Sequence, residues 1–255
     1  MIISRSESEG FDSEGIGFSI VIPFHNEEDS VGSVIKESLD ALDNLKDRKG
    51  EIIAVDDGSK DRTAEILAEV AAEDPRVRVI TFETNCGQAP ALYYGLNRAF
   101  GAIVATLDGD GQNNPADFSA MIKLLECSDA DLVSGVRKNR NDTWLRRTMS
   151  RVANRVRGGF LKDGVTDSGC AIKVFYRPVV DSLIPLQTLY SFIPALACAA
   201  GYKVAECQVD HRERVGGETH YGLGVMLWRP AFDMLGVWWF SRRRFAERMD
   251  SELRA

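Results

Sequence analysis

Short apolar runs alternate with apolar patterns of helical spacing along the chain, and this order restricts the fold more than any other feature of the sequence. Runs that predict strands buried on both faces of a sheet lie at 18–23, 51–55, 77–82, 102–107 and 131–136. Patterns that predict amphipathic helices lie between them, at 31–45, 64–70, 88–100 and 115–127. Because strand and helix alternate strictly, we expect an α/β fold with a mostly parallel central sheet, helices on both faces and right-handed crossovers.

The second half of the sequence is less regular. It predicts helices at 143–161, 177–183 and 188–200, with Pro194 as a potential kink, and strands at 171–175 and 202–210. Beyond residue 220, two apolar segments separated by Arg229-Pro230 predict C-terminal amphipathic helices.

The charge and cysteine content argue against several classes of protein. A formal net charge of −7 disfavours a nucleic-acid binder. The five cysteines include no Cys-x-x-Cys pair, so we expect reduced thiols and neither a disulfide framework nor a cysteine metal site. Residues 1–16 are rich in Ser, Glu and Gly, which predicts a disordered tail rather than a signal peptide. Since no run of about 18 apolar residues predicts a spanning helix, we expect a cytoplasmic protein.

The stretch from Leu107 to Pro115 reads Leu-Asp-Gly-Asp-Gly-Gln-Asn-Asn-Pro and follows the fourth predicted strand. Asp108, Asp110 and Gln112 therefore emerge where a parallel strand ends, and open α/β sheets bind ligands at that edge. Mg²⁺ and Mn²⁺ favour oxygen ligands and are usually shared between one or two carboxylates and substrate phosphates. The stretch predicts a metal ion bound to a diphosphate, and a solvated turn before the next helix is the alternative.

Polar residues also follow the first two predicted strands. Glu27 follows the first and Asp56-Asp57 the second, at the same edge of the sheet. An aspartate there can bind a ribose hydroxyl or the edge of a base. Ser59, Asp61 and Thr63 fit better as caps of the next helix, and Glu27 fits equally well as an acid in a first helical turn. The chain contains neither a Gly-x-Gly-x-x-Gly nor a P-loop pattern, which disfavours a dehydrogenase or P-loop protein.

Residues 137–162 carry nine basic side chains and one acidic side chain, Asp142, in a chain of negative net charge. The bases are Arg137, Lys138, Arg140, Arg146, Arg147, Arg151, Arg155, Arg157 and Lys162. This reversal of sign predicts an anionic ligand or an anionic membrane surface. A solvated helix face is the alternative, although such faces usually mix both signs.

Two loops have less specific signals. Residues 85–88, Asn-Cys-Gly-Gln, open the third predicted helix and form either a plain N-terminal turn or a loop beside a nucleotide. Residues 211–221 form a basic loop with two glycines that we expect to close over phosphates and exclude water. Its two histidines, His211 and His220, make a poor metal pair because nothing fixes their spacing.

Residues 221–240 contain three of the four tryptophans and precede Arg242-Arg243-Arg244. Aromatic side chains beside a basic cluster are typical of a helix in the membrane interface. Arg229, Pro230 and Asp233 disfavour a spanning helix. Packing on the core or on a second copy of the chain is the alternative, which leaves a homo-oligomer open.

Several motifs occur together in a fixed order. They are Pro23-Phe24-His25-Asn26-Glu27, Asp56-Asp57-Gly58-Ser59, Leu107-Asp108-Gly109-Asp110-Gly111-Gln112, Gly135-Val136-Arg137, the segment from Arg146 to Ser150, Asp167-Ser168-Gly169-Cys170, and His211 through Tyr221. In this order they resemble the family 2 glycosyltransferases, in particular the polyprenyl-phosphate branch that includes dolichyl-phosphate mannose synthase. The resemblance extends from Phe18 to Arg244. His25 stands where that family usually has Tyr, and Thr219-His220 stands where it has Ser-Lys.

The resemblance implies a GT-A (Rossmann-like) fold and a role for each matching position. The donor nucleotide would be bound by Pro23, His25, Glu27, Val55, Asp56, Asp108 and Gly109. Asp110 and Gln112 would bind Mg²⁺ or Mn²⁺. The catalytic and phosphate-binding residues would be Asp110, Arg137, Arg146, Ser150 and Arg214.

The resemblance also implies a reaction and a division of the chain into three parts. A sugar would move with inversion from GDP-mannose or a UDP-hexose to undecaprenyl or dolichyl phosphate, by a peripheral protein on the inner face of the cell membrane. The parts are the tail at 1–16, a glycosyltransferase domain at 17–220, and membrane-interface helices with a basic tail at 221–255. One alternative is an enzyme that glycosylates a saccharide hydroxyl, which requires a general base. The other is a non-catalytic nucleotide-binding or membrane-scaffold protein.

Overall fold

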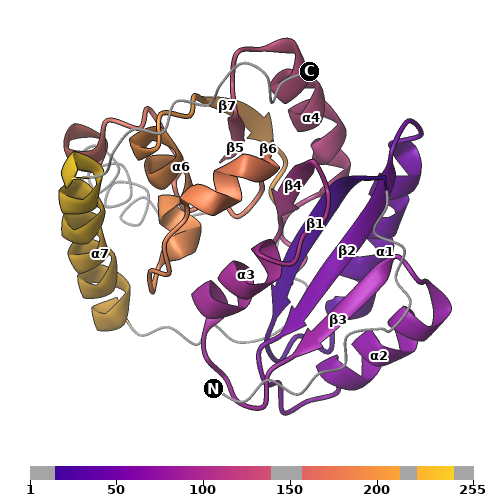
Figure 1. Ribbon diagram of the computed structural model, residues 1–255. Coiled ribbons are helices and arrows are strands. Elements are labelled where there is room, and N and C mark those ends of the chain that lie inside the picture. Colours follow the sequence, from indigo (N-terminus) through magenta and orange to yellow (C-terminus); the bar gives the residue numbers. More distant parts are fainter. Residues whose placement is uncertain (1–14, 139–156, 213–222, 244–255) are drawn as a thin grey trace.

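The computed structural model describes residues 15–138, 157–212 and 223–243. A seven-stranded sheet forms its centre (Figure 1). The strands are β1 (Ile16–Phe24), β2 (Lys49–Asp56), β3 (Val77–Thr81), β4 (Ile103–Thr106), β5 (Leu132–Arg137), β6 (Lys173–Tyr176) and β7 (Val204–Val209). Their order is β3-β2-β1-β4-β6-β5-β7. Only the pairs that involve β6 are antiparallel among the described strands, so the predicted mostly parallel sheet is confirmed.

Helices cover both faces of the sheet, as the sequence predicted. One face is covered by α1 (Val31–Asn44), α2 (Thr63–Glu73) and α4 (Phe118–Cys127), and the other by α3 (Gln88–Leu96) and α6 (Leu189–Ala199). The C-terminal helix α7 (Leu223–Arg243) packs against α6. Short 3₁₀ helices occupy Pro115–Asp117 and Arg177–Ser182. Successive strand residues point to opposite faces, so Ile20 and Ile22 of β1 join the first core while Val21 joins the second.

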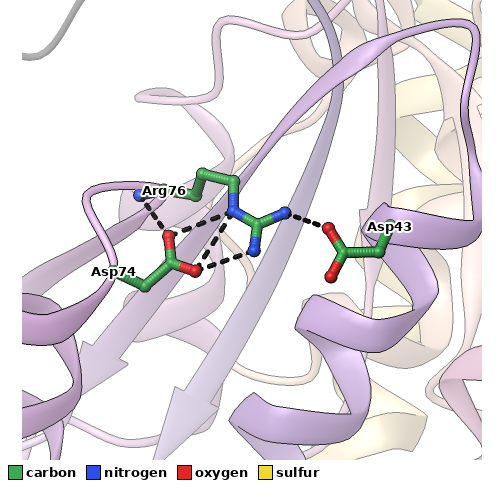
Figure 2. A network of polar contacts seen from close by, with 3 residues as sticks. All are labelled: Asp43, Asp74 and Arg76. Carbon is green, nitrogen blue, oxygen red and sulfur yellow. Dashed lines mark hydrogen bonds and ion pairs between the residues drawn. The ribbon is translucent and has the colours of Figure 1, made fainter.

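A set of ion pairs around Arg76 fixes the edge of the sheet where β2 and β3 begin (Figure 2). The Arg76 guanidinium donates to Asp74, at the end of α2, and to Asp43, near the end of α1, with nitrogen–oxygen distances of 2.7 Å and 2.5 Å. Hydrogen bonding to the Asp74 carboxylate raises the pKa of Arg76. This edge is therefore held by structural charges, and the polar loops with ligand-binding character lie at the opposite edge.

The C-terminal helix corrects one prediction. We expected Arg229-Pro230 to separate two helices, but α7 continues through Pro230 as one helix of 21 residues. Proline removes one backbone hydrogen bond. Packing compensates for that loss, because Val237 of α7 is buried in the second core and Asp233 accepts hydrogen bonds from the backbone N–H and the hydroxyl of Thr188. Likewise, α6 continues through the buried Pro194.

Other predicted segments fall partly outside the described residues. Of the helix expected at 143–161, residues 157–161 are helical and the preceding part is outside the described ranges. Of the tail expected at 1–16, residues 1–14 lie outside these ranges, and β1 already begins at Ile16. No helix within the described ranges combines the length and apolar character needed to cross a bilayer.

Candidate active site

The loops that follow β1 and β2 are joined at the carboxyl edge of the sheet. The backbone N–H of Asn26 donates to Ser59 Oγ (3.0 Å), and that of Glu27 donates to Thr63 Oγ1 (2.8 Å). Asp61 Oδ1 accepts from the Thr63 N–H (3.0 Å) at the start of α2. The capping role predicted for these three side chains is thus modified: Asp61 serves the start of α2 and also accepts from the Glu28 N–H, while Ser59 and Thr63 hold the β1 loop.

The two aspartates after β2 have different environments although both are buried. Asp57 accepts hydrogen bonds on both oxygens, from the backbone N–H groups of Cys86 and Gly87, each at 2.7 Å. Asp56 accepts from the Ser59 N–H and hydroxyl on Oδ1 alone, which leaves Oδ2 for a ligand. Desolvation by burial raises the pKa of both carboxyls. Asp56 therefore fits its predicted role at the nucleotide, whereas Asp57 is structural.

The predicted nucleotide-binding residues of β1 and β2 lie beside each other. Pro23 pairs with Val55 in the parallel register, and both side chains are buried. The His25 ring follows them: its Nδ1 lies 2.9 Å from the Asp57 carbonyl oxygen and its Nε2 lies 3.2 Å from Asn26 Nδ2. A carbonyl acceptor at Nδ1 and an amide donor at Nε2 fit the neutral tautomer with its proton on Nδ1.

The loop after β4 crosses directly over the end of β1. Gly109 has no side chain here for a steric reason, because a Cβ would lie 2.4 Å from the Phe24 ring. The buried Ser30 hydroxyl donates to the Gly109 carbonyl at 2.8 Å, which fixes the loop against the start of α1. This close approach brings the loop of Asp108 and Asp110 beside Glu27, which the same Ser30 hydroxyl contacts, at the sheet edge where β2 ends with Asp56.

Each aspartate of this loop is held through one of its two carboxylate oxygens. Asp108 Oδ1 accepts from the Gln88 side-chain amide at 2.6 Å, and Asp110 Oδ1 accepts from the Gln112 N–H at 3.0 Å. Burial, followed by the charge of Asp110, raises the pKa of Asp108 to about 7, while the nearby Lys173 acts in the opposite direction. A cation bound beside Asp108 and Asp110 would relieve this effect of the Asp110 charge on Asp108.

The donor set fits a hard divalent cation shared with a ligand. Asp110 and Gln112 present carboxylate and amide oxygens, which Mg²⁺ and Mn²⁺ favour. The described residues contain no cluster of three or more His, Cys, Asp or Glu side chains able to hold a metal ion by themselves. Two protein ligands suit an ion whose remaining positions are filled by diphosphate oxygens and water.

The residues that follow β7 are hydrogen-bonded to the loop after β4. The Arg212 N–H donates to the Gln112 carbonyl at 2.8 Å, and Asn113 forms an isolated β-bridge with His211. The Arg212 guanidinium also pairs with Glu37 of α1 at 2.7 Å. The segment predicted to close over the phosphates therefore starts beside the metal motif, although Arg214 itself lies outside the described residues.

On the other side of β4, Arg137 at the end of β5 forms a two-bond ion pair with Asp167. Its Nε and Nη2 donate to the two carboxylate oxygens, each at 2.7 Å. Lys173, the first residue of β6, is buried and donates to the Cys170 carbonyl. Desolvation by burial lowers the pKa of Lys173 to about 8. The structure thus brings Arg137 and the Asp167–Cys170 motif together, while Arg146 and Ser150 lie outside the described residues.

Fewer basic side chains of residues 137–162 are available to bind an anion than the charge count in the sequence indicated. Four of its bases are described, and three pair with acids from elsewhere: Arg137 with Asp167, Lys138 with Asp210, and Arg157 with Asp163. Arg157 is buried, so it belongs neither to a ligand surface nor to a solvated helix face.

Three residues of this region were not singled out from the sequence. Ser30, Gln88 and Lys173 contact or face the loop after β4. Lys173 had a detectable signal, as the one charge in an apolar run that predicted a buried strand. Gln88 belongs to the loop 85–88, for which the sequence allowed either a plain turn or a nucleotide contact. Ser30 had no signal beyond its place before a helix.

Comparison with known proteins places this geometry in a family. The model of the family described as "Glycosyl transferase family 2" matches residues 19–183. The chain is 37% identical over 209 residues to an undecaprenyl-phosphate 4-deoxy-4-formamido-L-arabinose transferase of Edwardsiella ictaluri, covering 80% of this chain and 63% of that protein. It is 33% identical to a dodecaprenyl-phosphate galacturonate synthase of Rhizobium johnstonii, covering 90% of this chain and 68% of the relative.

The fold is shared with a solved enzyme. Glucosyl-3-phosphoglycerate synthase of Mycobacterium tuberculosis, in a complex with Mn²⁺, UDP and its product, superposes with a TM-score of 0.65 at 21% identity, over 93% of this chain and 82% of that one. The predicted GT-A fold is therefore confirmed. Since the family model covers more than half of the sequence, the chain belongs to glycosyl transferase family 2.

Proposed function

We propose that this protein transfers a sugar from a nucleotide-diphosphate sugar to a polyprenyl phosphate, with inversion at the anomeric carbon. The observation that carries the proposal is the arrangement of Asp56, Asp108 and Asp110, each held by one oxygen at the carboxyl edge of the sheet. An acidic sheet edge of this kind suits the hydroxyls of a nucleoside and a cation bound to a diphosphate. Relatives that are named as polyprenyl-phosphate sugar transferases support the acceptor class.

The donor half would work by binding and orientation. Asp56 and Asp108 would accept hydrogen bonds from the nucleoside, and Asp110 with Gln112 would hold Mg²⁺ or Mn²⁺. When bound, the ion would neutralise the charge that develops on the leaving diphosphate. Related folds bound to Mn²⁺ or Mg²⁺ with UDP support this assignment.

The acceptor half would work without a general base. A phosphate acceptor is already an anion, so its oxygen needs aiming and charge complementarity rather than deprotonation. Arg137 would supply part of that charge, and its pairing with Asp167 would set the plane of its guanidinium. Arg146, Ser150 and Arg214 would complete the phosphate site.

The described end of α7 would place the protein on an anionic bilayer at the cytoplasmic face of the membrane. Phe232, Leu235 and Trp239 recur at helical spacing and are 70%, 51% and 59% exposed, while Val237 on the opposite face is buried. Arg242 lies over the Trp238 ring at 4.5 Å, and Arg243 follows it in the last turn of the helix. An aromatic stripe that ends in arginines complements acyl chains and anionic head groups.

The proposal is tested with a panel of UDP- and GDP-sugars and a short polyprenyl phosphate, scored for lipid-linked product. We expect product with at least one donor, lost in Asp110→Ala. Transfer to a saccharide instead, unaffected by Arg146→Ala, would favour the hydroxyl acceptor. Nucleotide binding that ignores both the metal and Asp110→Ala would contradict the catalytic proposal.

A further inference from the structure

The segment 86–88 bridges two strands that are not neighbours. Cys86 and Gly87 donate their N–H groups to Asp57, after β2, and Gln88 donates its side-chain amide to Asp108, after β4. In the sheet, β1 lies between β2 and β4. The segment therefore crosses the carboxyl end of β1 and connects the two acidic motifs on either side of it.

The conformation of this segment directs the Gln88 side chain away from its own helix. Gly87 precedes α3 with a φ of +98°, a backbone conformation that favours glycine, and α3 starts at Gln88 without a side-chain cap. Instead of accepting from the first N–H groups of α3, the Gln88 amide reaches Asp108 Oδ1 at 2.6 Å. The contact is thus a tertiary link to the loop after β4 rather than a helix cap.

The chemistry of the contact determines what Asp108 can bind. The amide N–H occupies Oδ1 of Asp108 and fixes the side-chain torsion of that residue. Oδ2 remains for a second donor. A hydroxyl is a suitable donor, and a glutamine amide that gives its N–H to a carboxylate keeps a carbonyl oxygen able to accept from an adjacent hydroxyl.

We propose that Gln88 is a positioning residue that holds Asp108 for the vicinal hydroxyls of the donor ribose. This rests on the proposed nucleotide-sugar function. Gln88 sets the orientation of Asp108, and the pair recognises a ribonucleotide in preference to a deoxyribonucleotide. Loss of Gln88 lets the Asp108 carboxylate rotate, so that the hydroxyl no longer meets a fixed acceptor.

The test compares ribo- and deoxyribonucleotides by calorimetry on the full chain in the presence of Mg²⁺. The probes are UDP and GDP, followed by the 2′-deoxy and 3′-deoxy analogues of whichever binds more tightly. Wild type should bind one deoxy analogue about tenfold more weakly, as expected for a lost hydrogen bond to a charged group. We call the ratio of the two dissociation constants, deoxy analogue over ribonucleotide, the deoxy penalty. Gln88→Ala should weaken binding of the ribonucleotide by about the same factor and reduce the deoxy penalty to less than about threefold.

Asn97→Ala is the matched control, since it removes a side-chain amide at the other end of α3 that donates to the Tyr93 carbonyl. It should leave the affinity and the deoxy penalty unchanged. Gln88→Asn keeps an amide that is too short to reach Asp108 and replaces Gln88→Ala if that variant does not fold. An unchanged deoxy penalty in the Gln88 variant, or none in wild type, would overturn the inference. Failure of wild type to bind either UDP or GDP would instead refute the proposed function, and the inference with it.

Discussion

The Ser30 hydroxyl donates to the carbonyl oxygen of Gly109, which lies 2.8 Å away in space and 79 positions later in the chain. Ser30 precedes α1, yet its hydroxyl does not cap that helix. It also contacts the Glu27 carboxylate at 3.1 Å. The loop after β1 and the loop that carries Asp108 and Asp110 are therefore held together by one buried side chain.

Ser30→Ala should lower both stability and activity. It leaves the Gly109 carbonyl without this donor in a buried position, which costs about 1–3 kcal/mol of the free energy of unfolding. Urea denaturation measures this cost. Ser33→Ala is the control because the exposed Ser33 hydroxyl donates to the Ser30 carbonyl, which keeps a second donor in the Val34 N–H. Equal midpoints for the two variants would contradict the role assigned to Ser30.

Asp110→Asn should remove the effect of metal on nucleotide binding. We expect Mg²⁺ to tighten UDP or GDP binding to wild type by at least about tenfold over EDTA, and the variant to bind equally with and without metal. Asp43→Asn, at the opposite edge of the sheet beside Arg76, should behave like wild type. A metal effect that survives in Asp110→Asn would assign the ion to other residues.

Asp167→Asn should destabilise the protein by about 2 kcal/mol, because the ion pair with Arg137 is mostly buried, with side chains 17% and 6% exposed. Asp181→Asn breaks the pair with Arg177, in which Asp181 is 74% exposed, and should change stability by less than about 0.5 kcal/mol. Thermal unfolding of both variants makes the comparison. The predicted ranking is wrong if Asp181→Asn is the more destabilised.

Lys173 should make stability depend on pH above neutrality. Burial lowers its pKa from 10.5 to about 8, so the unfolded chain binds this proton more tightly than the folded chain. The contribution of Lys173 to the free energy of unfolding should therefore fall as the pH decreases from 10.5 to about 8. Burial raises the pKa of Cys170 and of Cys198 to about 11, which acts in the opposite direction over this range. The Lys173 contribution is therefore measured as the difference between the urea midpoints of wild type and Lys173→Met, which should change with pH over this range. Lys123→Met, at an exposed position of α4, should retain the wild-type slope.

Replacing Phe232, Leu235 and Trp239 together by Ser should reduce binding to vesicles with anionic lipids by at least about tenfold, since each side chain loses apolar burial. Because all three are exposed, the melting temperature should change little. Arg62→Ser, an exposed substitution immediately before the distant helix α2, is the control for a surface change away from this face (Figure 1). Unchanged vesicle binding would contradict the membrane surface, and a dimer lost in the triple variant would assign this face to a second copy of the chain.

The sequence predicted the sheet, and the placement of acidic residues at its carboxyl edge, because both depend on local signals. Apolar runs of strand length located the strands, and Asp56, Asp108 and Asp110 each follow one of them. Two kinds of feature depend on tertiary distance and could not be predicted. The partners of Arg137 and Arg157 come from loops after the basic segment, and α7 continues through Pro230 because Asp233 and Val237 are fixed by the second core.

The reversed direction of β6 has a consequence for the connection that precedes it. Since β5 ends at Arg137 and β6 starts at Lys173, beside Thr106 of β4, the connection 138–172 leaves and re-enters the sheet at one edge. A parallel β6 would require a crossover to the opposite edge. A change in the length of this connection therefore requires no change in the register of β1, β2 and β4, the strands that precede the acidic motifs.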